Sequence, residues 1–144
     1  MNKKRLNLFL FLLLLGFTSG AKEFFVATSG NDQSRGTKNQ PFQTIYKASE
    51  AAMPGDTITI LGGEYQLLRQ FRPVRSGLPG KWILYRGAPG ETVVFDGSQI
   101  KKIFQNGDSV QFSRQTAGLF QIEKVNYLRF ENIHVRNSDA AGFI

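Results

Sequence analysis

The chain of 144 residues contains no cysteine, one histidine and one tryptophan. The absence of cysteine excludes disulfides and a lipid-anchored lipoprotein. The single histidine, His134, excludes a histidine cluster, and no zinc-ligand spacing occurs. A phosphate loop, a dinucleotide-binding motif and a serine-hydrolase elbow are also absent from the sequence. The chain must therefore be held together by its apolar core alone.

The longest apolar run of the chain lies at its N-terminus. Three basic residues precede an apolar stretch from Leu8 to Phe17, and small residues follow it. This layout predicts a signal peptide over residues 1–20, because the run is too short to anchor in a bilayer. A buried N-terminal helix is the alternative. Cleavage after Gly20 and cleavage after Ala21 satisfy the small-residue rule equally well. We therefore expect a secreted, periplasmic or cell-surface bacterial protein without a transmembrane anchor.

Removal of the leader takes away three of the 18 basic residues, so that 15 remain against 11 acidic ones. The net charge then falls from +7 to +4. A modest positive excess suits an acidic polymer such as a uronate glycan, although most such excesses are solvated surface. Because an exported protein meets glycans far more often than nucleic acid, no nucleic-acid partner is predicted. Residues 21–144 are enough for one domain with a sizeable core.

Glycine and proline divide this domain into short elements. Residues 22–27 predict a first strand, and Ile45, Ala48 and Ala52 recur at the spacing of one helix face. Pro54-Gly55 ends that helix. Strands are predicted at 57–60, 81–86, 92–95, 119–122 and 127–135, with an irregular insertion over 98–117.

Two features predict a coil that repeats. Gly118-Leu119-Phe120 is echoed by Gly142-Phe143-Ile144, an offset of 24 residues. Asn132 and Asn137 each follow a short alternating stretch, where an asparagine side chain suits a corner. A period of about 20–30 residues made of short strands and corners indicates a solenoid. Adjacent antiparallel hairpins would give similar strands and are the alternative.

The order of these motifs resembles the opening of secreted right-handed parallel β-helix proteins of the pectin lyase-like type. The motifs that carry the resemblance are Phe25-Val26, Ser29-Gly30-Asn31-Asp32, Gly36-Thr37, Pro41-Phe42, Thr44-Ile45, Gly62-Gly63, Trp82-Ile83, Ala88-Pro89-Gly90-Glu91 and Phe95-Asp96-Gly97-Ser98. The resemblance covers about residues 24–144. It is greatest to the pectate lyases of polysaccharide lyase family nine and smaller to the chondroitinase and alginate lyase group, family six.

The resemblance implies an all-β fold, a right-handed parallel β-helix (solenoid) with a short N-terminal capping helix. The helix around residues 45–52 would cover the open end of the coils, since a parallel stack needs a cap at each end. Residues 21–144 would then be the N-terminal cap and first coils of a domain truncated at its C-terminus. A monomer is expected.

The implied function is that of an exported protein acting on polysaccharide, foremost a lyase that cleaves uronate-containing glycans by β-elimination. The alternatives are a β-helix glycoside hydrolase and a non-catalytic glycan-binding or surface structural protein. The lyases it resembles use a lysine or arginine base and calcium held by clustered acidic side chains. The resemblance therefore implies calcium for the full-length protein. Because the eleven acids of this chain are scattered, no catalytic residue and no metal site is predicted within it.

The candidate substrate-binding residues are Arg129, His134 and Arg136, which point outward on the predicted strands. On a parallel sheet they would form part of a sugar-binding surface, and a solvated strand face is the competing interpretation. Trp82 and Tyr127 are candidate sugar platforms, provided that their rings are exposed.

Other polar residues favour structural roles. Asp32 and Asp96 each fit a polar turn better than a metal site or a catalytic acid. Arg69, Arg72 and Arg75 recur at every third position, which suits either an exposed loop or contact with an acidic glycan.

Overall fold

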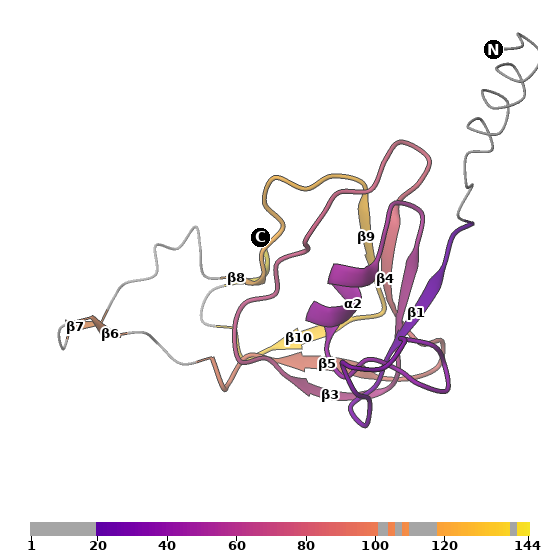
Figure 1. The fold of residues 1–144 in the computed structure, drawn as a ribbon. Helices are drawn as coiled ribbons and strands as arrows, with labels where there is room; N and C mark the ends of the chain where they lie inside the picture. The colour runs from indigo at the N-terminus through magenta and orange to yellow at the C-terminus, as the bar shows by residue number, and fades with distance from the viewer. Residues whose placement is uncertain (1–19, 101–103, 106–107, 110–117, 139–140) are drawn as a thin grey trace, which may run out of the picture.

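The computed structural model describes residues 20–100, 104–105, 108–109, 118–138 and 141–144 (Figure 1). The predicted signal peptide over residues 1–20 lies outside the described residues except for Gly20, and so does most of the predicted insertion over 98–117. Within the described ranges, the chain forms no helix long and apolar enough to cross a membrane.

Most of the strands belong to three parallel sheets. Sheet 1 contains, in spatial order, β1 (Glu23–Val26), β2 (Thr57–Ile60), β4 (Ile83–Gly87) and β9 (Leu128–Glu131). Sheet 2 contains β3 (Gly63–Gln66), β5 (Val93–Asp96) and β10 (His134–Arg136). Sheet 3 pairs β8 (Gly118–Phe120) with β11 (Ala141–Phe143), and an isolated parallel bridge joins Phe71 to Phe120.

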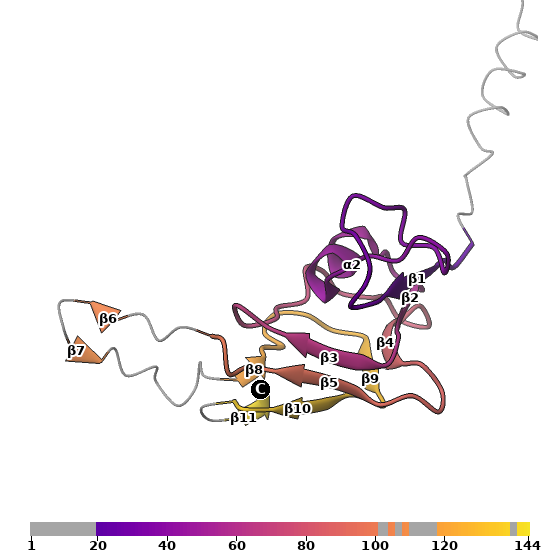
Figure 2. The ribbon, with the colours of Figure 1, turned by 90° about the horizontal axis from the view of Figure 1, so that it is seen from below.

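The chain visits these sheets three times in the same order. It passes from β2 through β3 to Phe71, then from β4 through β5 to β8, and finally from β9 through β10 to β11. Figure 2 shows the equivalent strands β3, β5 and β10 one below another. Among the described strands, only the short β6 (Phe104–Gln105) and β7 (Asp108–Ser109) pair antiparallel. The fold is therefore all-β and mostly parallel, and the alternative of adjacent antiparallel hairpins is wrong for the three sheets.

The pairing of sheet 3 corrects the predicted repeat by one residue. Gly118 pairs with Ala141 and Phe120 with Phe143, so the offset is 23 residues and not the predicted 24. The aromatic side chains decide this register, because the Phe120 and Phe143 ring centroids lie 4.7 Å apart. A shift by one residue would turn one of these rings away from the other. The two glycines, Gly118 and Gly142, are therefore not register partners.

Left-handed backbone at asparagine forms the predicted corners. Asn132 has φ 51° and Asn137 has φ 54°, a conformation that asparagine tolerates better than most residues. Asn132 and Ile133 alone connect β9 to β10, so the chain turns abruptly from sheet 1 to sheet 2. Figure 1 shows the strands of these two sheets running in clearly different directions.

The predicted capping helix is α2 (Ile45–Ala51). It begins after Thr44, whose Oγ1 accepts a hydrogen bond from the Lys47 N–H at 3.2 Å. Asp32 in turn accepts hydrogen bonds from the Thr44 N–H at 2.9 Å and from the Thr44 hydroxyl at 2.8 Å. The Asp32 side chain thus has the structural role that the sequence favoured.

One face of α2 packs on the coils. Ile45, Ala48 and Ala52 are buried in the main apolar cluster, as their spacing predicted. Ser49 on the same face lies 3.0 Å, hydroxyl to hydroxyl, from Tyr85 of sheet 1. Figure 2 shows the helix at one end of the stack, above β3 and β5. The helix therefore lies over the end of the stack, the position that a cap requires.

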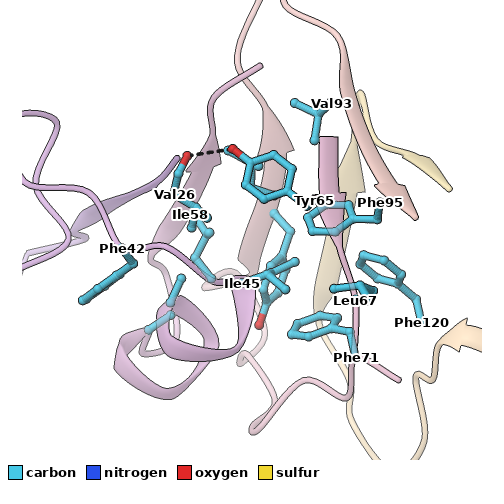
Figure 3. Packing of buried hydrophobic residues seen from close by; sticks show 14 of the residues in the cluster. Val26, Phe42, Ile45, Ile58, Tyr65, Leu67, Phe71, Val93, Phe95 and Phe120 are labelled. Carbon is cyan, nitrogen blue, oxygen red and sulfur yellow. Dashed lines mark hydrogen bonds between the residues drawn. The ribbon is translucent and has the colours of Figure 1, made fainter. Parts of the chain in front are cut away.

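Inward-facing rings form the centre of the core (Figure 3). The Phe120 ring is fully buried, with its centroid 5.0 Å from that of Phe71 and 5.2 Å from that of Phe95. Tyr65 stacks on Phe95 at 5.1 Å within sheet 2. Ring contacts of the core therefore join one coil to the next, and the Phe95–Phe120 contact joins two sheets within one coil.

Phe120→Ala is expected to lower the free energy of unfolding by about 3–5 kcal/mol, because it empties the centre of the ring cluster. Urea titration followed by circular dichroism measures this change. Leu68→Ala is the control: Leu68 is 74% exposed, and such surface changes stay within about 0.5 kcal/mol. Equal effects of the two substitutions would contradict the assigned core.

Asn132→Ala is expected to cost about 1–2 kcal/mol, because alanine resists the left-handed backbone at this corner. Asn132→Gly removes the same side chain but permits the conformation. The glycine variant should therefore unfold close to the wild-type temperature in a thermal melt. If both variants lose the same stability, the side chain matters more than the backbone.

Candidate functional site

The predicted substrate-binding residues lie on two different surfaces. Arg129 belongs to β9 in sheet 1, whereas His134 and Arg136 belong to β10 in sheet 2. All three side chains are exposed, and the corner at Asn132 separates the first from the other two. The structure therefore brings His134 and Arg136 together on one strand but does not bring Arg129 to the same sheet. A single sugar-binding surface made by all three was expected from the sequence, and the corner prevents it.

Arg136 is engaged by two carboxylates. Its Nε donates to Asp96 Oδ2 at 2.6 Å, and its guanidinium also forms an ion pair with Glu64. Asn137 donates to the same Asp96 oxygen at 2.9 Å, and the Ser98 N–H donates to Oδ1 at 2.7 Å. Because Arg136 joins residues of β3, β5 and β10, it ties three successive coils together. An acidic substrate would have to compete with both protein carboxylates for this guanidinium.

The environment of Asp96 favours its ionised form. Only 2% of the residue is exposed. Hydrogen bonds from Ser98, and then the one from the Arg136 guanidinium, hold the pKa of the Asp96 carboxyl well below its usual range. The same contacts, with Asp96 first and Glu64 second, raise the pKa of Arg136. Asp96 is thus an acceptor within a structural cluster and stays deprotonated, which does not suit a catalytic acid.

His134 lies in an outward row of sheet 2. It pairs in register with Val94, which pairs with Glu64 on the next strand. Neighbouring strands are about 4.8 Å apart, so His134 and Glu64 lie about 10 Å from each other across the row. Because Arg136 is already held by Asp96 and Glu64, His134 is better placed than Arg136 to contact a ligand.

Sheet 1 carries a groove of about 970 Å³ at the start of its strands. Lys81, Trp82, Leu84 and Arg129 are among its lining residues. Trp82 is 50% exposed, and Tyr127 beside it is 40% exposed. Both rings therefore have the exposure that a sugar platform requires. The charge, the exposed rings and the concave shape make this groove the strongest candidate for a binding site.

The arginines at every third position do not form one basic surface. The Arg69 guanidinium carbon lies 4.5 Å from the centre of the Tyr46 ring on α2. Arg75 donates to the Glu50 carbonyl, near the end of the same helix, at 3.0 Å. These contacts favour the structural role for Arg69 and Arg75, which hold the capping helix against the following loop.

The described carboxylates do not fit a calcium ion. Calcium takes six to eight oxygen ligands, mostly from several converging carboxylates. In the parts of the chain that the structure describes, no three acidic or histidine side chains converge in this way. Asp56 accepts from the Lys22 and Met53 N–H groups, and Glu91 accepts from the Gly62 N–H. These oxygens already accept hydrogen bonds from backbone N–H groups.

Three parallel sheets visited in turn, with a helix over one end, define a protein of the parallel β-helix class. Comparison with known proteins agrees. A family model described as the Pel9A-like right-handed beta helix region matches residues 24–144, and the chain belongs to this family. The predicted resemblance to family-nine pectate lyases is thereby confirmed.

Two curated relatives are similar over part of their length. The chain is 26% identical over 117 residues to pectate lyase PEL9 of Emericella nidulans, which covers 81% of the chain and 28% of the lyase. It is 38% identical over 76 residues to the uncharacterized protein YwoF of Bacillus subtilis (strain 168), which covers 53% of the chain and 16% of YwoF. The chain therefore spans less than a third of either relative.

Solved structures show the same fold. Pectate lyase Pel9A superposes with a TM-score of 0.61 at 23% identity, over 80% of this chain and 28% of the lyase. A GH136 lacto-N-biosidase from Eubacterium ramulus superposes with a TM-score of 0.62 at 18% identity, over 81% of this chain and 20% of that enzyme. Because one is a pectate lyase and the other a lacto-N-biosidase, the shared architecture alone does not determine the chemistry.

The Asp96 cluster is expected to make stability depend on pH. Because the folded-state pKa of Asp96 lies below its unfolded value of about 3.9, the ionised carboxylate stabilises the fold above that pH. This stabilisation is lost as the pH falls towards the folded pKa. Asp96→Asn should therefore lower the melting temperature at neutral pH and flatten its fall in acid. Glu50→Gln on the exposed face of α2 is the control, and parallel acid profiles for wild type and Asp96→Asn would contradict the assignment.

Proposed function

We propose that this chain is the N-terminal cap and first coils of a longer, exported β-helix protein that acts on polysaccharide. The observation that carries the proposal is the family match over residues 24–144, together with the 26% identity to a pectate lyase. The coil order supports a right-handed solenoid that closes around its aromatic core. The basic and apolar N-terminus supports export with residues 1–20 as the leader. The protein is proposed to act as a monomer.

The leading activity is cleavage of uronate-containing glycans by β-elimination. This reaction needs a base to take the proton α to the carboxylate, a cation to neutralise that carboxylate, and a proton for the leaving oxygen. The described residues supply exposed cations, but Asp96 is committed to Arg136 and Ser98. Because the sequence predicts no catalytic residue within this chain, we assign substrate contact to this part of the protein. Arg129 and His134 are the better candidates, since Arg136 is held by two carboxylates.

Calcium is proposed as a cofactor of the full-length protein only. The carboxylates described here are occupied by N–H donors and by Arg136, so calcium would need other ligands. In such an enzyme, this chain supplies the capping helix and the first coils. It thereby extends the surface along which a glycan lies.

The test is to follow the absorbance of unsaturated uronate with the full-length protein on pectate, alginate and chondroitin sulfate. A rise on at least one polymer is expected, and EDTA should abolish the reaction while leaving the melting temperature of the 144-residue chain unchanged. New reducing ends without the absorbance would identify a hydrolase. Binding without either product would identify a non-catalytic glycan-binding protein. Both of these results would contradict the lyase.

A further inference from the structure

We propose that the groove of sheet 1 beside Trp82 and Tyr127 is a non-catalytic binding site for a carboxylate-bearing glycan. The glycan class rests on the proposed function, whereas the location rests on the geometry of the groove.

The floor of the groove is regular. Thr57, Leu84 and Arg129 line it and are register partners across β2, β4 and β9. With strands about 4.8 Å apart, this row extends for about 10 Å across the sheet. A flat floor of this kind suits an extended polymer. Gly20 and Ala21 also line the groove, at the predicted cleavage point of the leader.

A rigid turn forms one wall. Leu78 and Lys81 exchange two backbone hydrogen bonds, of 2.8 and 3.0 Å. Pro79 and Gly80 lie between them, and Gly80 has φ 73°, which is the pattern of a type II turn. This turn fixes the start of β4 and with it the position of Trp82. The wall is therefore formed before any ligand arrives, which reduces the ordering cost of binding.

The rim carries two exposed rings. The Trp82 and Tyr127 centroids lie 5.7 Å apart with the ring planes at 86°, an edge-to-face pair. Large rings that are half exposed are uncommon on a protein that meets only water, and they mark binding surfaces when they gather. A sugar ring presents apolar C–H faces beside polar edges, so an aromatic face with polar neighbours suits it.

Tyr127 is held in a strained conformation. Its φ of 55° lies in the left-handed region, which costs a residue with a side chain about 1–2 kcal/mol. The Ile83 N–H donates to its carbonyl at 3.0 Å, and a Cβ placed on Gly77 would lie 2.5 Å from that same oxygen. Neighbouring strands therefore impose the conformation. Strain of this kind gathers at sites where a side chain must be presented in a particular direction.

The charge of the groove selects the ligand. Lys81 and Arg129 line it, and none of its lining residues is acidic. Arg129 is 66% exposed, and its Nε forms an ion pair of 2.5 Å with Glu131 on the same strand, which is not a lining residue. Within the described ranges, Lys81 forms no ion pair. Two cations on a rim with exposed rings match a sugar polymer that carries carboxylates.

The test compares short oligogalacturonates, whose carboxylates are charged, with their methyl esters, whose carboxyl groups are neutral. Isothermal titration with the purified 144-residue chain should show tighter binding of the acid form. Trp82→Ala should weaken binding of both forms about tenfold or more, as expected for loss of an aromatic anchor. Leu68→Ala, also exposed and apolar but outside the groove, should leave the affinity unchanged.

Tyr127→Asn separates binding from folding. Asparagine removes the ring but tolerates the left-handed backbone, so the melting temperature should stay the same or rise while the affinity falls. The Lys81→Gln, Arg129→Gln double variant should lose affinity for the acid form and keep that for the ester. Arg35→Gln, an exposed arginine outside the groove, is the matched charge control.

Wild-type affinity in both Trp82→Ala and Tyr127→Asn overturns the proposed site. Equal binding of acid and ester, or binding of neither, overturns the proposed ligand. These outcomes are independent of the lyase assay on the full-length protein. If that assay gives no product while Trp82→Ala still weakens binding, the lyase activity fails and the site stands. If product forms while the groove variants bind normally, the site fails alone.

Discussion

The register of the coils is held by the packing of one aromatic ring against its equivalent one coil away. Phe71, Phe120 and Phe143 occupy successive coils at one face, with adjacent centroids 5.0 and 4.7 Å apart. Because side chains alternate along a strand, these contacts permit only one register. That register also aligns the outward residues in rows. The surface chemistry of this protein is therefore a consequence of how its core packs.

The two outward surfaces use their charges differently. On sheet 2, Arg136 is bound between Asp96 and Glu64, so its charge joins coils and is partly neutralised. On sheet 1, the groove gathers exposed rings and two cations without an acidic lining residue. Arg136 thus supports the fold on one face, whereas Arg129 is paired with Glu131 alone, stays 66% exposed and lines the groove on the other face.

Most of the fold was predictable, because it follows local rules. The face of α2, the Pro-Gly stop after it and the asparagine corners are set by residues close together in the chain. The candidate site was less predictable. Arg129, His134 and Arg136 are near in sequence, yet a two-residue corner at Asn132 turns the last two onto another sheet. The exposure of Trp82 and Tyr127 depends on strands far apart in the chain, so no local pattern reveals it.

The class of architecture and the capping helix follow from the sequence, because residue spacing, turns and glycine or proline breaks act within a few residues. Only packing between coils set the 23-residue offset between Phe120 and Phe143, the ion pairs of Arg136 with Asp96 and Glu64, and the groove beside Trp82. Each of these depends on which residues from different coils become neighbours. Side-chain packing across the stack makes that choice, and its partners are 20 or more residues apart along the chain.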